Sequence, residues 1–225
     1  MEALAKEWLP DTVLVDEEFQ TNRYIENSYD NPKEYSFRSQ LHQLITKVQS
    51  TRDLPTDKLS IIIPAISDLL YEKTYFGMGN ISEEDNKTYT KLYDVFEEGG
   101  LIVKPDIILH LSMEQKLVQK RIVERGRGFE KDIDPVFLST LFKNFLEYIE
   151  KTDIPVIPVG TGYYDFREEN IRKVQASWIS SRITIALQNK FSDKTSGLLY
   201  PKAFFSKEVK YKDIFPGTNV ESRGL

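Results

Sequence analysis

The feature that most constrains the fold is a series of short apolar runs separated by segments with helical periodicity. The runs are rich in β-branched residues and lie at 12–15, 60–63, 105–111 and 155–159. Apolar residues three and four positions apart predict helices at 35–48, 68–76, 84–98, 113–125, 135–150 and 168–188. Short apolar strands between helices are typical of parallel sheets that are buried on both faces. The sequence therefore predicts an α/β fold in which helices cover both faces of a parallel sheet of about four strands.

Composition narrows the class of protein further. The 225 residues include no cysteine and only two histidines, His42 and His110, which argues against disulfides, thiol chemistry and a multi-histidine metal site. A net charge of −5 argues against non-specific nucleic-acid binding. No apolar run approaches the ~20 residues that span a bilayer, and residues 1–10 contain no signal-peptide core. We expect a soluble cytoplasmic protein, with one domain at 1–188 and a C-terminal tail or docked extension at 189–225.

Polar residues follow the predicted strands at the ends where ligands bind in open α/β sheets. Acidic residues 16–18 follow the first strand, Ser67 and Asp68 the second, and Ser112 the third. One carboxylate could accept a hydroxyl proton, another could hold Mg²⁺, and arginines could neutralise a transferring phosphoryl group. The pattern therefore suits phosphoryl transfer, although ordinary solvated loop charges explain it equally well.

A basic segment at 121–130 is more informative. Arg121 and Arg125 lie four residues apart on one helix face, and Arg127 lies between Gly126 and Gly128. Like charges at this spacing disfavour a helix, so we expect an anion to compensate and the segment to stay open until phosphate binds. The alternative is a solvated basic helix end, which the helix dipole favours.

This segment, R-I-x-x-R-G-R-x-x-E followed by F-L-x-x-L-F-x-x-F-L-x-Y-I, resembles the lid region of the deoxynucleoside kinases. Upstream, V-L-V-D-E-E-F and the later N-P-K-E-Y-S-F-R-S-Q are similar to the family's substrate-binding segments, so the resemblance covers roughly residues 1–185. It implies a P-loop-kinase-like three-layer sandwich and ATP- and Mg²⁺-dependent phosphorylation of a deoxynucleoside 5′-hydroxyl. It also implies a homodimer, with purine nucleosides slightly favoured and no nucleic-acid or membrane partner.

The resemblance also implies roles for individual residues. Glu17 matches the glutamate that accepts the 5′-hydroxyl proton, and Asp68 matches an acid near the metal. Residues that match substrate contacts are Tyr29 and Glu130 for the 3′-hydroxyl, and Gln40 and Phe37 for the base. Residues that match the lid arginines around the ATP phosphates are Arg121, Arg125 and Arg127, the last two next to the reacting groups.

Each of these residues also has an ordinary structural explanation. Glu17 could be a solvated loop acid, and Tyr29 a half-buried packing residue. Gln40 could be an exposed helix amide, and Asp68 a helix N-cap.

The sequence departs from the family pattern at the phosphate-binding loop. The family has G-x-x-x-x-G-K-[S/T] after its first strand, whereas this sequence has no glycine before Gly77 and no Gly-Lys dipeptide. Residues 1–9 align with the helix that normally follows this loop, so we expect the sandwich to be missing its first strand together with the phosphate-binding loop. The chain is then either a shortened form or a natural remnant that kept the nucleoside side. We therefore expect impaired phosphoryl transfer. The alternative is a nucleotide-binding pseudokinase or an interaction module.

Two smaller departures concern other loops. Leu69 follows the acid where the family has Arg or Tyr, and an apolar side chain there cannot contact the 5′-oxygen. The segment from Gly160 to Gly162 lies where the family's adenine-side loop falls, and it could equally be a plain turn.

Overall fold

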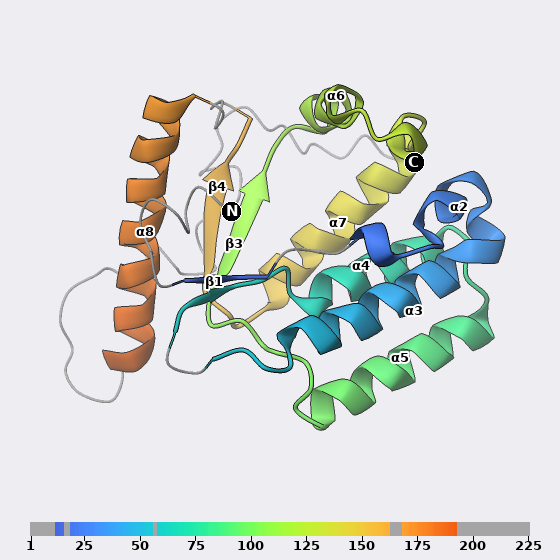
Figure 1. Cartoon of the computed structure of the whole chain (residues 1–225), viewed down its shortest axis with the longest axis horizontal. Helices are drawn as coiled ribbons and strands as arrows, with labels where there is room; N and C mark the ends of the chain where they lie inside the picture. The colour runs from blue at the N-terminus through green and yellow to red at the C-terminus, as the bar shows by residue number, and fades with distance from the viewer. Residues whose placement is uncertain (1–11, 16–18, 56–57, 163–167, 193–225) are drawn as a thin grey trace. The chain divides into compact units, whose positions relative to one another are not determined.

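Parallel strands between helices, as the sequence predicts, form the framework of the protein (Figure 1). The computed structural model describes residues 12–15, 19–55, 58–162 and 168–192. They fall into two compact units, one formed by residues 1–105 and 119–149 and the other by residues 106–118 and 150–225. The expected boundary between 1–188 and 189–225 remains a prediction, since most of the second segment lies outside the described residues.

The first unit contains one strand pair and most of the helices. Strands β1 (Val13–Leu14) and β2 (Ser60–Ile61) pair in parallel, with Val13 opposite Ser60. The helical elements are η1 (Phe19–Thr21), α2 (Ile25–Asp30), α3 (Pro32–Thr51), α4 (Ala65–Gly77), α5 (Glu83–Glu98), η2 (Gly128–Glu130) and α7 (Pro135–Lys151). Helix α6 (Gln115–Arg125) contributes residues to both units.

The second unit is built on the other strand pair. Strands β3 (Ile108–Ser112) and β4 (Val156–Gly160) pair in parallel over five positions, from Ile108 opposite Val156 to Ser112 opposite Gly160. Helix α8 (Glu169–Ser192) packs along β4 (Figure 1). All four strands that the sequence predicted are therefore present, and they form two parallel pairs.

Two apolar clusters hold the helices of the first unit together. Leu44 of α3 packs with Ala65 of α4 and with Tyr89 and Tyr93 of α5, and Leu44 and Tyr89 are completely buried. A second cluster joins α4 to α7, with the rings of Tyr75 and Phe137 4.7 Å apart. Full burial of one such side chain contributes about 1.5–3 kcal/mol. The clusters therefore fix the faces of α3, α4 and α5 that point toward one another.

Local signals explain where several of these elements begin and end. The Ser82 hydroxyl caps α5 by accepting a hydrogen bond of 3.1 Å from the Asp85 backbone N–H. Pro32 occupies the first turn of α3, where its missing N–H costs nothing. Within the described residues, every helix is too short or too polar to span a lipid bilayer.

Candidate functional site

The candidate site begins at α2, which carries Tyr29. The buried side chain of Asn22 holds the start of this helix against α3, because its amide donates hydrogen bonds to the backbone oxygen and hydroxyl of Ser39 at 3.1 and 3.0 Å. Its own carbonyl oxygen accepts from the Tyr24 backbone N–H at 3.1 Å. Tyr29 is therefore displayed from a short helix whose position relative to α3 is fixed by buried hydrogen bonds.

Tyr29 and Glu130, the two residues expected at the sugar, lie in segments that contact each other. Helix α2 packs against η2, and the Tyr29 ring lies 5.3 Å from the ring of Phe129, the residue before Glu130. Glu130 itself is only 5% exposed. A phenol and a buried carboxylate in adjoining segments offer the donor and acceptor that a sugar hydroxyl needs.

Glu130 binds two of the three basic residues that the sequence singled out. One of its carboxylate oxygens accepts a short hydrogen bond from the Arg125 guanidinium, and the other accepts from Arg127 at 3.2 Å. The Arg127 guanidinium also stacks on the Phe19 ring, 3.6 Å from its centroid. We call this group of Glu130, Arg125, Arg127 and Phe19 the arginine clasp.

The clasp corrects one expectation. We expected the arginines to repel one another and leave the segment open until an external anion arrives, but a carboxylate of the same segment already neutralises Arg125 and Arg127. Gly126 adopts a φ of 75°, a left-handed conformation that glycine reaches without strain, and this turn brings the arginines around Glu130. Arg121 lies earlier on α6 with an exposed side chain and is not part of the clasp.

Gln40 and Phe37, the residues expected at the base, lie one turn apart on α3. Gln40 is 6% exposed, so the alternative of an exposed helix amide is not what the structure shows. Phe37 packs against both apolar clusters of the first unit. The face of α3 that carries Gln40 thus presents a buried amide with both hydrogen-bond donors and an acceptor.

Two polar residues on the same helix face were missed by the sequence reasoning. Gln43 and Lys47, one and two turns after Gln40, are both buried. The sequence signal for them was present, because polar residues recur at three- and four-residue spacing among the apolar ones. Since α3 packs against α4 and α5, these side chains line the interior of the unit rather than its surface.

Asp68, expected near a metal ion, lies in the first turn of α4 and is 4% exposed. Its charge adds to the effect of burial in raising the pKa of the Tyr89 and Tyr93 phenols of α5. Burial is the larger cause of each of these pKa shifts. The described part of the chain contains no group of three acidic, histidine or cysteine side chains placed to ligate a metal. Since Mg²⁺ binds through one or two carboxylates and keeps several waters, the assignment of Asp68 to this ion stays a prediction. We derive no step through this ion.

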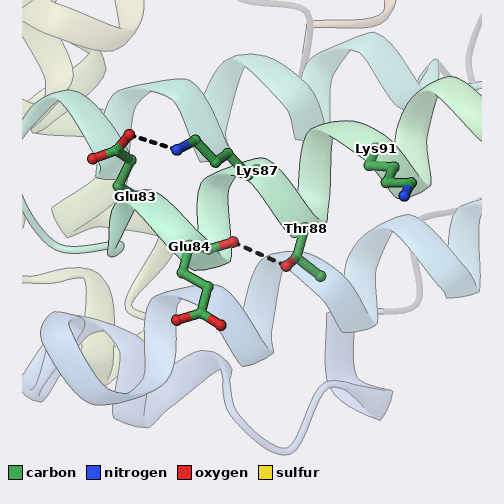
Figure 2. Close-up of a pocket in the computed structure, with 5 residues that line it drawn as sticks. All are labelled: Glu83, Glu84, Lys87, Thr88 and Lys91. Atoms are coloured by element: carbon green, nitrogen blue, oxygen red, sulfur yellow. Dashed lines mark hydrogen bonds and ion pairs between the residues drawn. The ribbon is translucent and has the colours of Figure 1, made fainter.

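Two candidates from the sequence remain, Glu17 and the glycine segment that ends at Gly162. Glu17 lies outside the described residues. In the second unit, a Cβ added at Gly162 would lie 3.3 Å from Leu117 of α6, so close packing explains this glycine. A separate pocket lies on the charged face of α5, lined by Glu83, Glu84, Lys87, Thr88 and Lys91 (Figure 2). None of the expected site residues lines it.

Comparisons with known proteins identify the family to which the chain belongs. A family model described as deoxynucleoside kinase matches residues 3–183. The chain is 25% identical over 170 residues to deoxyadenosine kinase of Dictyostelium discoideum, which covers 74% of this chain and 69% of that protein. It is 27% identical over 159 residues to deoxyguanosine kinase of Bacillus subtilis, covering 68% of this chain and 76% of that protein.

A solved structure shows the same fold. Deoxyadenosine kinase from M. mycoides, with the products dCMP and dCDP bound, superposes with a TM-score of 0.66 at 22% identity, covering 81% of this chain and 90% of that one. The parallel strands and helices are thus those of a P-loop-kinase-like α/β protein, which confirms the predicted fold class. The chain belongs to the deoxynucleoside kinase family.

Proposed function

We propose that the chain binds a purine deoxynucleoside through its first unit and that its reaction is phosphorylation of the nucleoside 5′-hydroxyl by ATP. The observation that carries the proposal is the buried Gln40 side chain, whose amide offers both donors and an acceptor. A base edge supplies the complementary pair. The two relatives above are named for deoxyadenosine and deoxyguanosine, which supports a purine.

The sugar would lie beside α2 and η2. The Tyr29 hydroxyl and the Glu130 carboxylate come from segments that pack together, since the Tyr29 ring contacts that of Phe129. Phe37, one turn before Gln40, would form an apolar wall of the base site. The proposal thus assigns separate residues of neighbouring segments to the two halves of one nucleoside.

Transfer would break the bond between the β–γ bridging oxygen and the γ-phosphorus of ATP and form a bond between the 5′-oxygen and that phosphorus. The hydroxyl proton would pass to Glu17, the residue assigned to this role by family resemblance. Arg125 and Arg127 would stabilise charge on the transferring group, and Arg121 would bind a neighbouring phosphate, because guanidiniums suit phosphate oxygens.

We further propose that this 225-residue polypeptide catalyses the transfer poorly. It contains no Gly-Lys dipeptide and hence no phosphate-binding loop of the usual sequence. Loss of one preorganised donor of this kind costs on the order of 10²–10³ in rate, and such a loop provides several. The alternative is a pseudokinase that holds a nucleoside or nucleotide without turnover.

Calorimetric titration with deoxyadenosine and deoxyguanosine tests the binding site. We expect Gln40→Ala to weaken binding by roughly 5- to 150-fold, because about 1–3 kcal/mol is lost when a buried partner is left unsatisfied. Gln49→Ala on the exposed face of the same helix is the matched control and should leave affinity unchanged. Absence of binding to the wild-type chain at millimolar nucleoside would refute the proposed site.

Incubation with ATP, Mg²⁺ and each of the four deoxynucleosides separates the slow kinase from the pseudokinase. Slow product formation that Arg125→Ala abolishes supports the first, and binding without product supports the second. Turnover near one per second would contradict the proposal that this polypeptide catalyses phosphoryl transfer poorly. Sedimentation of the same sample tests a further proposal from the family resemblance, a homodimer. We also propose a cytoplasmic location, which imaging of the tagged protein in cells would test.

A further inference from the structure

The ring of Phe19 has no role in the function proposed above, although the Arg127 guanidinium lies on its face. The guanidinium carbon is 3.6 Å from the ring centroid, well inside the separation of about 6 Å at which a cation and an aromatic ring attract each other. Other arginine–aromatic contacts in the described part of the chain are longer, from 4.8 to 5.6 Å. Phe19 and Arg127 are therefore a closely stacked pair, although 108 positions separate them in the sequence.

The backbone of Phe19 is held in place from α3. Phe19 begins η1, and its carbonyl oxygen accepts a hydrogen bond of 3.1 Å from the Asn22 backbone N–H. The Asn22 side chain is 2% exposed and donates to the backbone oxygen and hydroxyl of Ser39 on α3. Buried hydrogen bonds of this kind are costly to break, so they fix the start of η1 relative to α3. The Phe19 ring thus extends toward Arg127 from a fixed backbone position.

Phe19 and Glu130 act on Arg127 in different ways. The Glu130 carboxylate accepts a hydrogen bond of 3.2 Å from Arg127 Nη1 and neutralises its charge. An aromatic ring attracts the cation through its quadrupole and leaves the charge intact. The N–H groups of a guanidinium lie in its plane, so stacking on a ring uses none of them. The Arg127 side chain is also 31% exposed, and an arginine held by its face in this way can still donate to phosphate oxygens.

We propose that Phe19 is a positioning residue for Arg127, which it holds in the orientation that binds a phosphate group. The ring becomes important when Glu130 binds the sugar hydroxyl, because a carboxylate oxygen that accepts from a ligand holds Arg127 less firmly. The contact with Phe19 does not depend on that exchange. Phe19 is also only two positions after Glu17 in the sequence, the residue assigned to the hydroxyl proton. This inference rests on the phosphate-binding role proposed for Arg127.

Calorimetric titration of the full chain with inorganic tripolyphosphate tests the proposal, because this anion is the phosphate chain of ATP without the nucleoside. Phe19→Leu keeps an apolar side chain but removes the aromatic face, and should weaken binding by about 3- to 10-fold. Phe19→Tyr keeps that face and should restore wild-type affinity. Tyr24→Leu is the matched control, since it removes a nearby ring that stacks on Arg23 instead, and it should leave the affinity unchanged.

A double-mutant cycle separates positioning from a merely structural role of Phe19. With Arg127→Ala already present, Phe19→Leu should cause no further loss of tripolyphosphate affinity, because no guanidinium is left to orient. Equal losses with and without Arg127 would overturn the inference, and so would an unchanged affinity of Phe19→Leu. If Phe19→Leu does not fold, pentafluorophenylalanine in place of Phe19 decides, since fluorination keeps the shape of the ring and removes its attraction for cations. Weaker tripolyphosphate binding by that protein supports the inference, and unchanged binding contradicts it.

Titration of the same samples with deoxyadenosine and deoxyguanosine distinguishes failure of this inference from failure of the proposed function. Wild-type tripolyphosphate affinity in Phe19→Leu, together with nucleoside binding, would overturn the inference alone. A wild-type chain that binds nucleoside but no tripolyphosphate at millimolar concentration would overturn both the phosphate-binding role of Arg127 and the inference. A chain that binds tripolyphosphate through Arg127 and Phe19 but no nucleoside would support the inference and refute the proposed nucleoside site.

Discussion

Replacing Glu130 by glutamine should release the arginine clasp. The substitution keeps the size of the side chain but removes the charge that binds Arg125 and Arg127. The Arg127 guanidinium would keep its contact with the Phe19 ring, whereas Arg125 would lose its carboxylate partner. We therefore expect the segment around Gly126 to open more often, with the larger effect at Arg125.

The size of the expected destabilisation follows from how deeply Arg125, Arg127 and Glu130 are buried. A hydrogen bond to a charged group is worth about 1.5–3 kcal/mol when shielded from water. The arginine side chains are 49% and 31% exposed, so solvent screening reduces each pair to about 0.5–1 kcal/mol. Loss of both pairs would destabilise the closed segment by about 1–2 kcal/mol, which corresponds to roughly 5- to 30-fold more opening.

Limited trypsin digestion measures this opening, because cleavage after an arginine requires local unfolding and follows the open population. Cleavage after Arg125 should accelerate roughly 5- to 30-fold in Glu130→Gln, and sulfate should restore protection by replacing the lost carboxylate. Glu124→Gln, which breaks only an exposed 3.8 Å pair with Lys120, is the control and should cleave like wild type. Equal cleavage of Glu130→Gln and wild type would refute the clasp and support a simple solvated helix end.

The remaining predictions concern stability, measured by urea unfolding. Burial raises the pKa of Glu72 above 4.5, so folding favours the protonated form and this residue's contribution to stability falls as the pH rises above that value. The free energy of unfolding of Glu72→Gln should therefore increase relative to that of the wild type between pH 4 and pH 7. A difference between the two proteins that stays constant over this range would contradict the prediction. Leu44→Ala should cost about 2–5 kcal/mol and the exposed Ile45→Ala much less. Gly126→Ala should cost about 1–2 kcal/mol because of its φ of 75°, whereas Gly128→Ala should cost less, and equal losses would exclude backbone strain as the cause.

Much of the fold could be predicted because periodicity and strand apolarity are local signals. The helix expected at 84–98 is α5, from Glu83 to Glu98, and the helix expected at 135–150 is α7, from Pro135 to Lys151. Helix α2 and η1 were missed, because their polar sequences carry no apolar period. Their positions depend on hydrogen bonds between Asn22 and Ser39. These two residues are seventeen positions apart in the sequence, so no local pattern predicts their contact.

The sequence could predict which residues belong to the candidate site, but not how they are arranged. Spacing indicated that Arg125 and Arg127 belong together, but not that Glu130 binds both, because the φ of Gly126 sets that geometry. Asp68 was expected near a metal after a strand, and the structure shows it buried in the first turn of α4, the helix that follows β2, with its role toward a metal still a prediction. Burial of polar side chains depends on how α3, α4 and α5 pack, and one sequence does not reveal that packing.

The central claim is that Gln40, Tyr29 and Glu130 hold one deoxynucleoside. Amide NMR spectra of the chain with selectively ¹⁵N-labelled glutamine side chains test it most directly, because Gln40 and the exposed Gln49 report in the same experiment. We predict that saturating deoxyguanosine or deoxyadenosine shifts the Gln40 side-chain amide and leaves that of Gln49 in place. An unmoved Gln40 amide in the presence of both nucleosides at millimolar concentration would contradict the account.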